Sequence, residues 1–250
     1  MNEFAVYQAF DPLDYLKTYY TVIGSEGDGM LRFLAETFSA LPANLRVLEY
    51  GGGPTIIGMI SAATRAASMD FCDYVDSNRA LVQRWLSGDE QDFDWNPFLA
   101  RALEFEGIEA PTNEQVGERA ALMRRVVHNV LPGDIYAMPP APVEGRYDVV
   151  MSHFCLDAVT REKAQWQENI RNLCTLLQPG GTLILSSLRE AHFPEEGKRA
   201  FPNVYLQEED VRETLESVGF PAESIRIVSA DADNTDRDYT GIILSSSVAL

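Results

Sequence analysis

The spacing of apolar residues predicts two helices within the first 41 residues. The first apolar stripe consists of Leu13, Leu16, Tyr19 and Tyr20. Asp11 followed by Pro12 is a favoured pair for the N-cap and first position of such a helix. Residues 23–29 contain three glycines and predict a break before a second apolar stripe, which covers residues 30–41 and ends at Pro42.

Short apolar runs then alternate with amphipathic segments along the rest of the chain. We expect strands over residues 45–50, 69–74, 125–130, 147–152, 182–187, 225–230 and 241–248. We expect helices over residues 56–67, 79–86, 161–177 and 208–218, and a mostly helical arrangement of the more polar residues 88–120. The last two strands are expected to form an antiparallel hairpin across the turn-rich residues 231–238. Repeated strand–helix units predict an α/β fold with a mainly parallel sheet covered by helices on both faces.

The composition fits one globular domain that handles a small molecule. The chain has 250 residues, of which 46% are hydrophobic, and this is enough for a substantial core. Its 38 acidic and 20 basic residues give a net charge of -18, which repels nucleic acid and anionic lipid and attracts cations. We therefore expect no nucleic-acid or membrane partner, and a small-molecule partner that is cationic. Solubility alone is the alternative explanation of the charge.

The cysteines and the N-terminus favour a cytoplasmic protein without a metal. The three cysteines are Cys72, Cys155 and Cys174. They lie in apolar stretches and lack the spacing of metal ligands or redox pairs, as is typical of a reducing compartment. The first ten residues include an acid and no base, unlike a signal peptide, and no apolar run approaches the roughly 20 residues that span a bilayer. We expect a cytoplasmic monomer or homodimer.

A glycine loop follows the first predicted strand, where ligands bind in parallel sheets. Gly51, Gly52 and Gly53 allow a ligand to approach the backbone closely before the next helix begins. A dinucleotide fingerprint would require a third spaced glycine at position 56, which is Ile56, and Pro54 lacks a backbone amide. The loop therefore indicates a nucleotide-type ligand without a pyrophosphate, and a structural turn is the alternative.

Acids follow the second and third predicted strands. Asp73 lies twenty-two positions after Gly51, where a carboxylate typically binds ribose hydroxyls, and Asn78 is placed to assist. Asp76 is a competing candidate that could equally cap the next helix. After the third strand, Asp134 could accept from an adenine amino group while Ile135 packs on the ring. A solvated loop acid remains the other interpretation of Asp134.

The fourth predicted strand ends in a motif that would lie beside the same ligand. The motif SHFCLDA covers residues 152–158 and places His153, Phe154 and Asp157 at the carboxyl edge of the sheet. His153 could instead be a hydrogen-bonded packing residue, and Asp157 could cap the following helix.

Together these motifs resemble the nicotinamide/phenylethanolamine/amine N-methyltransferase family. In chain order they are DPLDYLKTYY (11–20), EYGGGPT (49–55), CDYVDSN (72–78), RWL with FDWNP (84–97), SHFCLDA (152–158) and RNLCTLLQPGGTLIL (171–185). The resemblance implies a class I methyltransferase (Rossmann-like) fold that binds S-adenosyl-L-methionine. It also implies one domain over residues 1–250, with an N-terminal helical lid (1–41), a cofactor-binding core (42–250) and an acceptor-side insertion near 188–206.

The resemblance assigns roles to individual residues. The cofactor-binding residues it implies are Tyr15, Tyr20, Gly51, Gly52, Gly53, Thr55, Asp73, Tyr74, Asn78, Asp134, Ile135, His153 and Phe154. The acceptor-side residues are Phe154, Asp157, Ala158, Ser187 and His192. The catalytic candidates are Tyr15, Tyr20, His153, Asp157 and Glu190, of which the last three are candidate bases.

The acceptor side departs from the family pattern. Where members that act on amines or pyridines often carry an acid after the fifth strand, this chain has Ser187, with Glu190 three residues on. An aromatic residue expected nearby is replaced by Pro194, beside His192 and Phe193. These departures argue against nicotinamide itself as the acceptor.

The expected reaction is in-line methyl transfer to an amine or N-heterocycle. A pyridine or tertiary amine would need no base, whereas an ammonium must first lose a proton. The alternatives are transfer to oxygen or sulfur, and an enzyme that cyclises the aminobutyrate part of the cofactor and releases methylthioadenosine. A protein that binds the cofactor without catalysis is the remaining interpretation.

Overall fold

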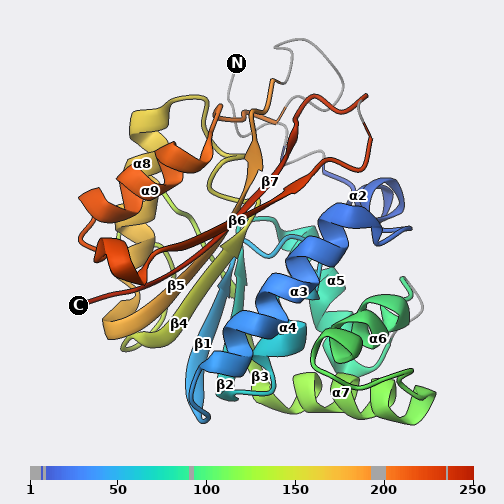
Figure 1. The fold of residues 1–250 in the computed structure, drawn as a ribbon. Helices are drawn as coiled ribbons and strands as arrows, with labels where there is room; N and C mark the ends of the chain where they lie inside the picture. Colours follow the sequence, from blue (N-terminus) through green and yellow to red (C-terminus); the bar gives the residue numbers. More distant parts are fainter. Residues whose placement is uncertain (1–6, 8–9, 90–92, 193–200, 235) are drawn as a thin grey trace.

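The computed structural model describes residues 7, 10–89, 93–192, 201–234 and 236–250, which form an α/β fold on a seven-stranded sheet (Figure 1). The strands are β1 (Leu45–Tyr50), β2 (Ala66–Asp73), β3 (Val127–Pro132), β4 (Tyr147–His153), β5 (Leu177–Arg189), β6 (Arg226–Asp231) and β7 (Gly241–Val248). The helices are α2 (Pro12–Tyr19), α3 (Gly24–Ala40), α4 (Ile57–Ala62), α5 (Asp76–Ser87), α6 (Asn96–Phe105), α7 (Asn113–Val126), α8 (Lys163–Cys174) and α9 (Glu208–Ser217), with a short 3-10 turn at Ala222–Ser224.

The strand order is β3-β2-β1-β4-β5-β7-β6. Strands β1 to β5 pair in parallel, whereas β7 runs antiparallel to both β5 and β6. The order reverses between β1 and β4, so the segments that follow these two strands lead to opposite faces of the sheet and leave a crevice at the carboxyl edge, which is where α/β sheets bind ligands. The predicted parallel sheet and C-terminal hairpin are confirmed.

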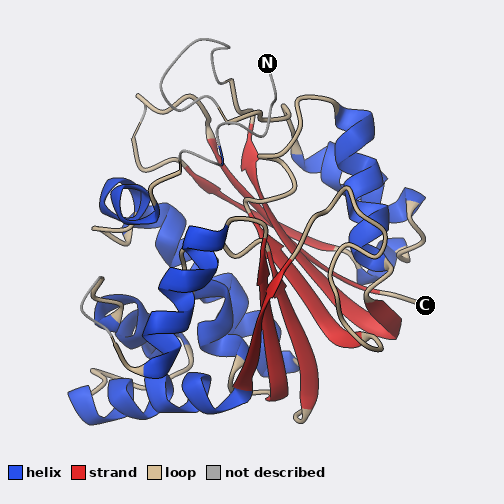
Figure 2. Cartoon of the chain, turned by 180° about the vertical axis from the view of Figure 1, so that it is seen from behind, coloured by secondary structure: helices blue, strands red, loops and turns tan. Residues whose placement is uncertain are grey.

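Helices cover both faces of the sheet (Figures 1 and 2). One core layer packs α3 to α7 against strand residues such as Val47, Phe71 and Met151. The other packs α8 and α9 against the alternate residues, such as Leu48 and Val150. Because successive strand side chains point to opposite faces, apolar runs such as LRVLEY supply both layers at once.

The break predicted over residues 23–29 is shorter than expected. The turn between α2 and α3 is complete by Ile23, and α3 then continues through Gly27 and Gly29. A Cβ at Gly29 would lie 2.9 Å from the Cβ of Ala230 on β6. The glycine therefore permits a close approach between helix and sheet, and this packing outweighs its low helix propensity.

Other boundaries differ by a few residues. Helix α4 ends at Ala62, α8 ends at Cys174, and β5 is longer at both ends than expected. Strand β3 begins two residues later than predicted because α7 continues to Val126. Phe193 and Pro194 lie outside the described residues, as does much of the expected insertion near 188–206. In the part of the chain that the structure describes, no helix combines the length and apolarity needed to cross a membrane.

The N-terminus of α3 is held by a residue from the far end of the chain. Its N-cap, Ile23, supplies no side-chain hydrogen bond. Instead, the Asp233 carboxylate accepts from the backbone amides of Ser25 and Glu26, and the Ser25 hydroxyl donates to it at 2.5 Å. Gly24 precedes this contact with a φ of 61°, and a Cβ there would overlap the carboxylate.

We expect Asp233→Ala to lower the free energy of unfolding by about 1 kcal/mol, the usual effect of removing a helix cap. Urea titration followed by circular dichroism measures the change. Asp236→Ala, in the same loop, is the control and should stay within about 0.5 kcal/mol of wild type. Equal effects of the two substitutions would contradict the capping role.

Candidate active site

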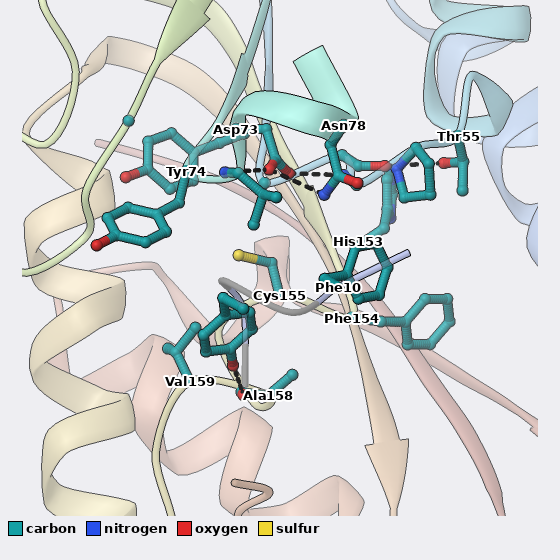
Figure 3. Close-up of a pocket in the computed structure, with 18 of the residues that line it drawn as sticks. Phe10, Thr55, Asp73, Tyr74, Asn78, His153, Phe154, Cys155, Ala158 and Val159 are labelled. Atoms are coloured by element: carbon teal, nitrogen blue, oxygen red, sulfur yellow. Dashed lines mark hydrogen bonds between the residues drawn. The ribbon is translucent and has the colours of Figure 1, made fainter. Parts of the chain in front are cut away.

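A cavity opens at the carboxyl edge of the sheet, at the crevice between β1 and β4 (Figure 3). The expected residues that line it are Tyr15, Tyr20, Gly51, Gly52, Gly53, Thr55, Asp73, Tyr74, Asn78, Asp134, Ile135, His153, Phe154 and Ala158. They come from segments more than a hundred residues apart, because parallel strands end at the same edge. We call this space the cofactor cavity.

The glycine loop leaves room for a ligand at one of its three positions. Gly51 and Gly53 have φ values of 66° and 62°, in the left-handed region that favours glycine. A Cβ on Gly51 would overlap the thiol of Cys155, and one on Gly52 would overlap the ring of Phe71. A Cβ on Gly53 would meet nothing within 4 Å. The loop therefore packs against the protein at Gly51 and Gly52 and is open at Gly53, where the methionine end of the expected cofactor would fit.

Asp73 links this loop to the segment after β2. Its Oδ2 accepts from the Gly53 amide at 2.8 Å. Its Oδ1 accepts from the Val75 amide at 2.8 Å and from Asn78 Nδ2 at 3.1 Å. Burial raises the pKa of Asp73, while these three donors oppose the rise. Spare lone pairs remain for ribose hydroxyls, and the buried Asn78 Oδ1 has no hydrogen-bond partner within the described residues.

The competing acid, Asp76, lies outside the cavity. It begins α5, its side chain is exposed, and it pairs with Arg79. Asp134 does line the cavity, where its Oδ1 accepts from the Tyr136 amide at 3.0 Å, and Ile135 beside it is buried. These residues would hold the adenine end.

Aromatic residues from both ends of the chain cover the cavity. Tyr15 and Tyr20 have ring centroids 5.7 Å apart, and Phe10 packs against both Tyr15 (5.3 Å) and Phe201 (5.8 Å). The Tyr7 hydroxyl donates to the carbonyl oxygen of Ala158. Sequence reasoning missed Tyr7, Phe10 and Phe201, because isolated aromatic residues outside a motif give no signal. Burial raises the pKa of Tyr20 to about 12, so its hydroxyl stays neutral.

The comparisons with known proteins agree with this geometry. The model of the NNMT/PNMT/TEMT family matches residues 1–248. Phenylethanolamine N-methyltransferase of Homo sapiens is 30% identical over 257 residues, covering 96% of this chain and 89% of the relative. Nicotinamide N-methyltransferase of Homo sapiens is 27% identical over 252 residues, covering 93% and 90%. The N-methyltransferase NodS from Bradyrhizobium japonicum WM9, solved with S-adenosyl-l-homocysteine, matches with a TM-score of 0.56 and 14% identity, covering 100% of this chain and 99% of that one.

The chain belongs to the NNMT/PNMT/TEMT family. The expected family, class I methyltransferase fold and S-adenosylmethionine-dependent methyl transfer to a small molecule are thereby confirmed. Within the described residues no cluster of three or more His, Cys, Asp or Glu could hold a metal ion.

A second chamber adjoins the cofactor cavity. It lies between the turn after α2, the first turns of α3 and the loop from β6 to β7. The two spaces share Tyr15, Tyr20, Met30, Phe154, Ala158 and Phe201. Phe154 has a φ of 53° and lines both spaces, so it lies at the boundary between them. We call this space the acceptor chamber.

The motifs in the sequence did not predict the acidic residues that line the acceptor chamber. They are Glu26, Asp233, Asp236 and Asp238, with Arg237 as the basic residue among the described lining. The signal available in the sequence was the acid-rich run DADNTDRD at 231–238, which we interpreted only as a turn. Glu26 gave no signal, because it lies in the segment expected to be a helix break.

Three of the expected acceptor-side residues, and the catalytic candidate Glu190, line neither space. Leu188 faces the acceptor chamber, so strand alternation turns the buried Ser187 away from it. Glu190 follows β5 with a φ of 52°, is half-buried, and is hydrogen-bonded to Tyr205, Gln207 and Thr240. The His192 ring packs 4.9 Å from that of Tyr205. None of these three side chains therefore lines either space.

Asp157 is the fourth residue that lines neither space, and its hydrogen bonds stabilise the fold. It is buried, its Oδ2 accepts from the Leu188 amide at 2.8 Å, and its backbone carbonyl accepts from Val204 at 3.1 Å. It does not cap α8, which starts at Lys163. Burial raises the pKa of Asp157 to about 6. The expected role as a base in contact with the acceptor is therefore not supported by its position.

His153 lines the cofactor cavity, but its ring nitrogens are turned into the protein. Nδ1 lies 2.7 Å from Ser186 Oγ, and Nε2 faces Glu49. Burial lowers the pKa of His153 to about 3, so the ring is neutral and weakly basic at physiological pH. This argues against the expected role of His153 as a general base.

We expect Asp73→Asn to weaken binding of S-adenosylmethionine by about 1.5–3 kcal/mol, roughly 10- to 150-fold, because charge-assisted hydrogen bonds are lost. Titration calorimetry measures the affinity. S-adenosylhomocysteine shares the ribose, so its affinity should fall by the same factor. A loss confined to one of the two ligands, or no loss, would contradict a ribose contact.

The raised pKa of Asp157 implies that the free energy of unfolding depends on pH. A protonated Asp157 favours the folded state, and this contribution is lost as the pH rises through about 6. Asp157→Asn keeps an acceptor for the Leu188 amide but does not ionise. We expect the difference in unfolding free energy, Asp157→Asn minus wild type, to be about 1–2 kcal/mol larger at pH 7.5 than at pH 5. Urea titrations at both pH values measure this, and a difference that does not change with pH would refute the assignment.

Proposed function

We propose that this enzyme transfers the methyl group of S-adenosylmethionine to the nitrogen of a small, cationic aromatic amine. The observation that carries the proposal is the acid-lined acceptor chamber, which opens onto the cofactor cavity beside Phe154. Four carboxylates and one guanidinium line it in the described residues, so the chamber attracts positive charge.

Glu26 is the acid best placed to hold the amine. It is half-buried on the first turn of α3, and its Oε2 accepts from the Tyr239 hydroxyl at 3.3 Å. Burial raises the pKa of Glu26, which makes its carboxylate a better proton acceptor than an exposed one. Asp238 lies at the exposed rim, and its carboxylate makes no hydrogen bond or ion pair within the described residues.

The chamber walls suit an aromatic acceptor. Tyr15, Tyr20, Phe98 and Phe154 line it on the side of the cofactor cavity, and Tyr19 and Tyr239 line it near the acids. Aromatic faces stabilise both a flat ring and the positive charge that passes to the product. An ammonium nitrogen anchored at Glu26 would thus have apolar walls around its ring.

The mechanism requires alignment more than acid–base chemistry. The bound cofactor supplies an electrophilic methyl group on a sulfonium. Tyr15, Tyr20 and Phe154 enclose the boundary between the two spaces and exclude water from it. Glu26 orients the nitrogen and takes its proton at a carboxylate oxygen before attack. No base is needed when the acceptor is a pyridine or a tertiary amine.

Cyclisation of the cofactor is the second candidate, and the site disfavours it. That reaction needs a base or a nucleophile oriented inside the cofactor cavity. His153, which we considered for this role, is neutral, and its nitrogens face Ser186 and Glu49. Transfer to oxygen or sulfur would leave the carboxylates of the acceptor chamber without a partner.

We also propose a cytoplasmic location and a monomer or homodimer. Three unpaired cysteines support the reducing compartment.

We expect S-adenosylhomocysteine to form only when an aromatic amine is added, and Glu26→Gln to lower kcat/KM for that amine at least tenfold because the ammonium loses its anchor. Mass spectrometry of the products over a panel of amines and N-heterocycles measures both. Asp238→Asn should have a smaller effect, mainly on KM, because the rim is solvated.

Glu190→Gln is the matched control, since Glu190 lies outside the acceptor chamber. Its kcat/KM should match wild type. A greater loss in Glu190→Gln than in Glu26→Gln would reverse the assignment. Methylthioadenosine released without any acceptor would overturn methyl transfer as the reaction.

A further inference from the structure

A buried carboxyl group lies directly beneath the glycine loop and has no role in the mechanism above. Glu49 is on β1, and its side chain is 3% exposed. A Cβ on Gly52 would lie 2.9 Å from Glu49 Cγ, and one on Gly58 would overlap Glu49 Oε2. Glycines on the loop and on α4 therefore leave a space that the Glu49 carboxyl fills.

Glu49 faces His153 across this space. Glu49 Oε2 and His153 Nε2 lie 3.9 Å apart, and neither atom has a hydrogen-bond partner within the described residues. The other ring nitrogen of His153 lies 2.7 Å from Ser186 Oγ. The three side chains come from the neighbouring strands β1, β4 and β5, and His153, the middle one, lines the cofactor cavity.

The surroundings of Glu49 lack positive charge. The titratable groups that face it are His153 from β4, Asp73 from β2 and Tyr20 after α2. In the described chain, no lysine or arginine forms an ion pair with it. Burial, and then the nearby Asp73, raise the pKa of Glu49 well above its usual value, and burial keeps His153 neutral. These surroundings favour the protonated form of Glu49 and the neutral form of the His153 ring.

We propose that Glu49 is a positioning residue that senses the charge of the cofactor through His153: it is protonated in the free enzyme and releases its proton when the sulfonium form binds. The proton passes to solvent, and a carboxylate remains beneath the cavity. His153 then carries its single proton on Nε2, toward Glu49, and accepts at Nδ1 from Ser186. The Ser186 hydroxyl can donate or accept, so no heavy atom need change its partner.

This device would distinguish substrate from product. The methylated cofactor carries a sulfonium cation, which the Glu49 carboxylate stabilises. After methyl transfer the thioether is neutral, so the buried carboxylate loses its partner and takes up a proton again. The charged cofactor is thus favoured over its product. The inference depends on cofactor binding and not on the identity of the acceptor.

Titration calorimetry tests the proposal in wild-type protein at pH 6.5, where the amino groups of both ligands stay largely protonated. Runs in buffers of different ionisation enthalpy count the protons exchanged. We expect S-adenosylmethionine to release up to about one proton more than S-adenosylhomocysteine does. Equal proton release by the two ligands would overturn the proposal.

Glu49→Gln replaces the protonated carboxyl with a neutral amide of the same shape, so the free variant should keep the melting temperature of wild type. It should lose the difference in proton release and most of the preference for the charged ligand, while its affinity for S-adenosylhomocysteine stays within threefold. Asp157→Asn is the matched control, because it also removes a buried carboxyl, and it should retain the difference. A Glu49→Gln protein that still releases the extra proton would refute the role of Glu49.

A pH series on wild type keeps the test independent of any variant. The affinity ratio of S-adenosylmethionine to S-adenosylhomocysteine should rise from pH 5.5 to 7, as the free Glu49 becomes easier to ionise. A ratio that does not change over this range would refute the proposal. Both outcomes are read without an acceptor, so they do not depend on whether an amine is methylated.

Discussion

The buried carboxylate of Asp73 is the constraint on which the rest of the cofactor cavity depends. A carboxylate removed from water stays ionised only when several donors point at it, and here the donors come from the glycine loop, the turn after β2 and α5. The bonds that solvate the charge therefore also fix three segments relative to one another. The negative charge at Asp73 has a second effect, because it makes ionisation of nearby Glu49 more difficult. One acid thus defines the shape of the cavity and the protonation of the groups beneath it.

The features that the sequence predicted are those set by local pattern. Apolar runs such as LRVLEY and YDVVMS identified β1 and β4, and the glycines after β1 identified the ligand loop. Parallel strands end at one edge, so the sequence alone predicts that the residues following each strand share a single cavity. The mistaken break before α3 had a different origin. Gly29 is required by the proximity of Ala230, a contact between residues about two hundred positions apart that no local window contains.

The acceptor chamber illustrates the same limit for function. Glu26 and Asp238 lie at opposite ends of the chain, and only the packing of α3 against β6 and β7 brings their segments together. Glu190 was a candidate from the sequence because the resemblance implied an acid after this strand, and Glu190 is three residues beyond the aligned Ser187. The extra length of β5 and the left-handed turn at its end direct Glu190 outward instead. The residues expected at the cofactor end line one cavity because they follow strands that end at the same edge. The acids that line the acceptor chamber lie at a helix start and in a loop, where no local pattern in the sequence pointed to them.

The cap that Asp233 provides to α3 has a consequence for how acceptor preference can diverge among related enzymes. The loop that carries Asp233 also supplies Asp236 and Asp238 to the acceptor chamber, and the helix it caps supplies Glu26. Insertions or grafts in this loop would therefore alter selectivity and helix stability together. Under the proposed function, a library that diversifies Asp236 and Asp238 while holding position 233 constant would change acceptor selectivity without removing the cap of α3.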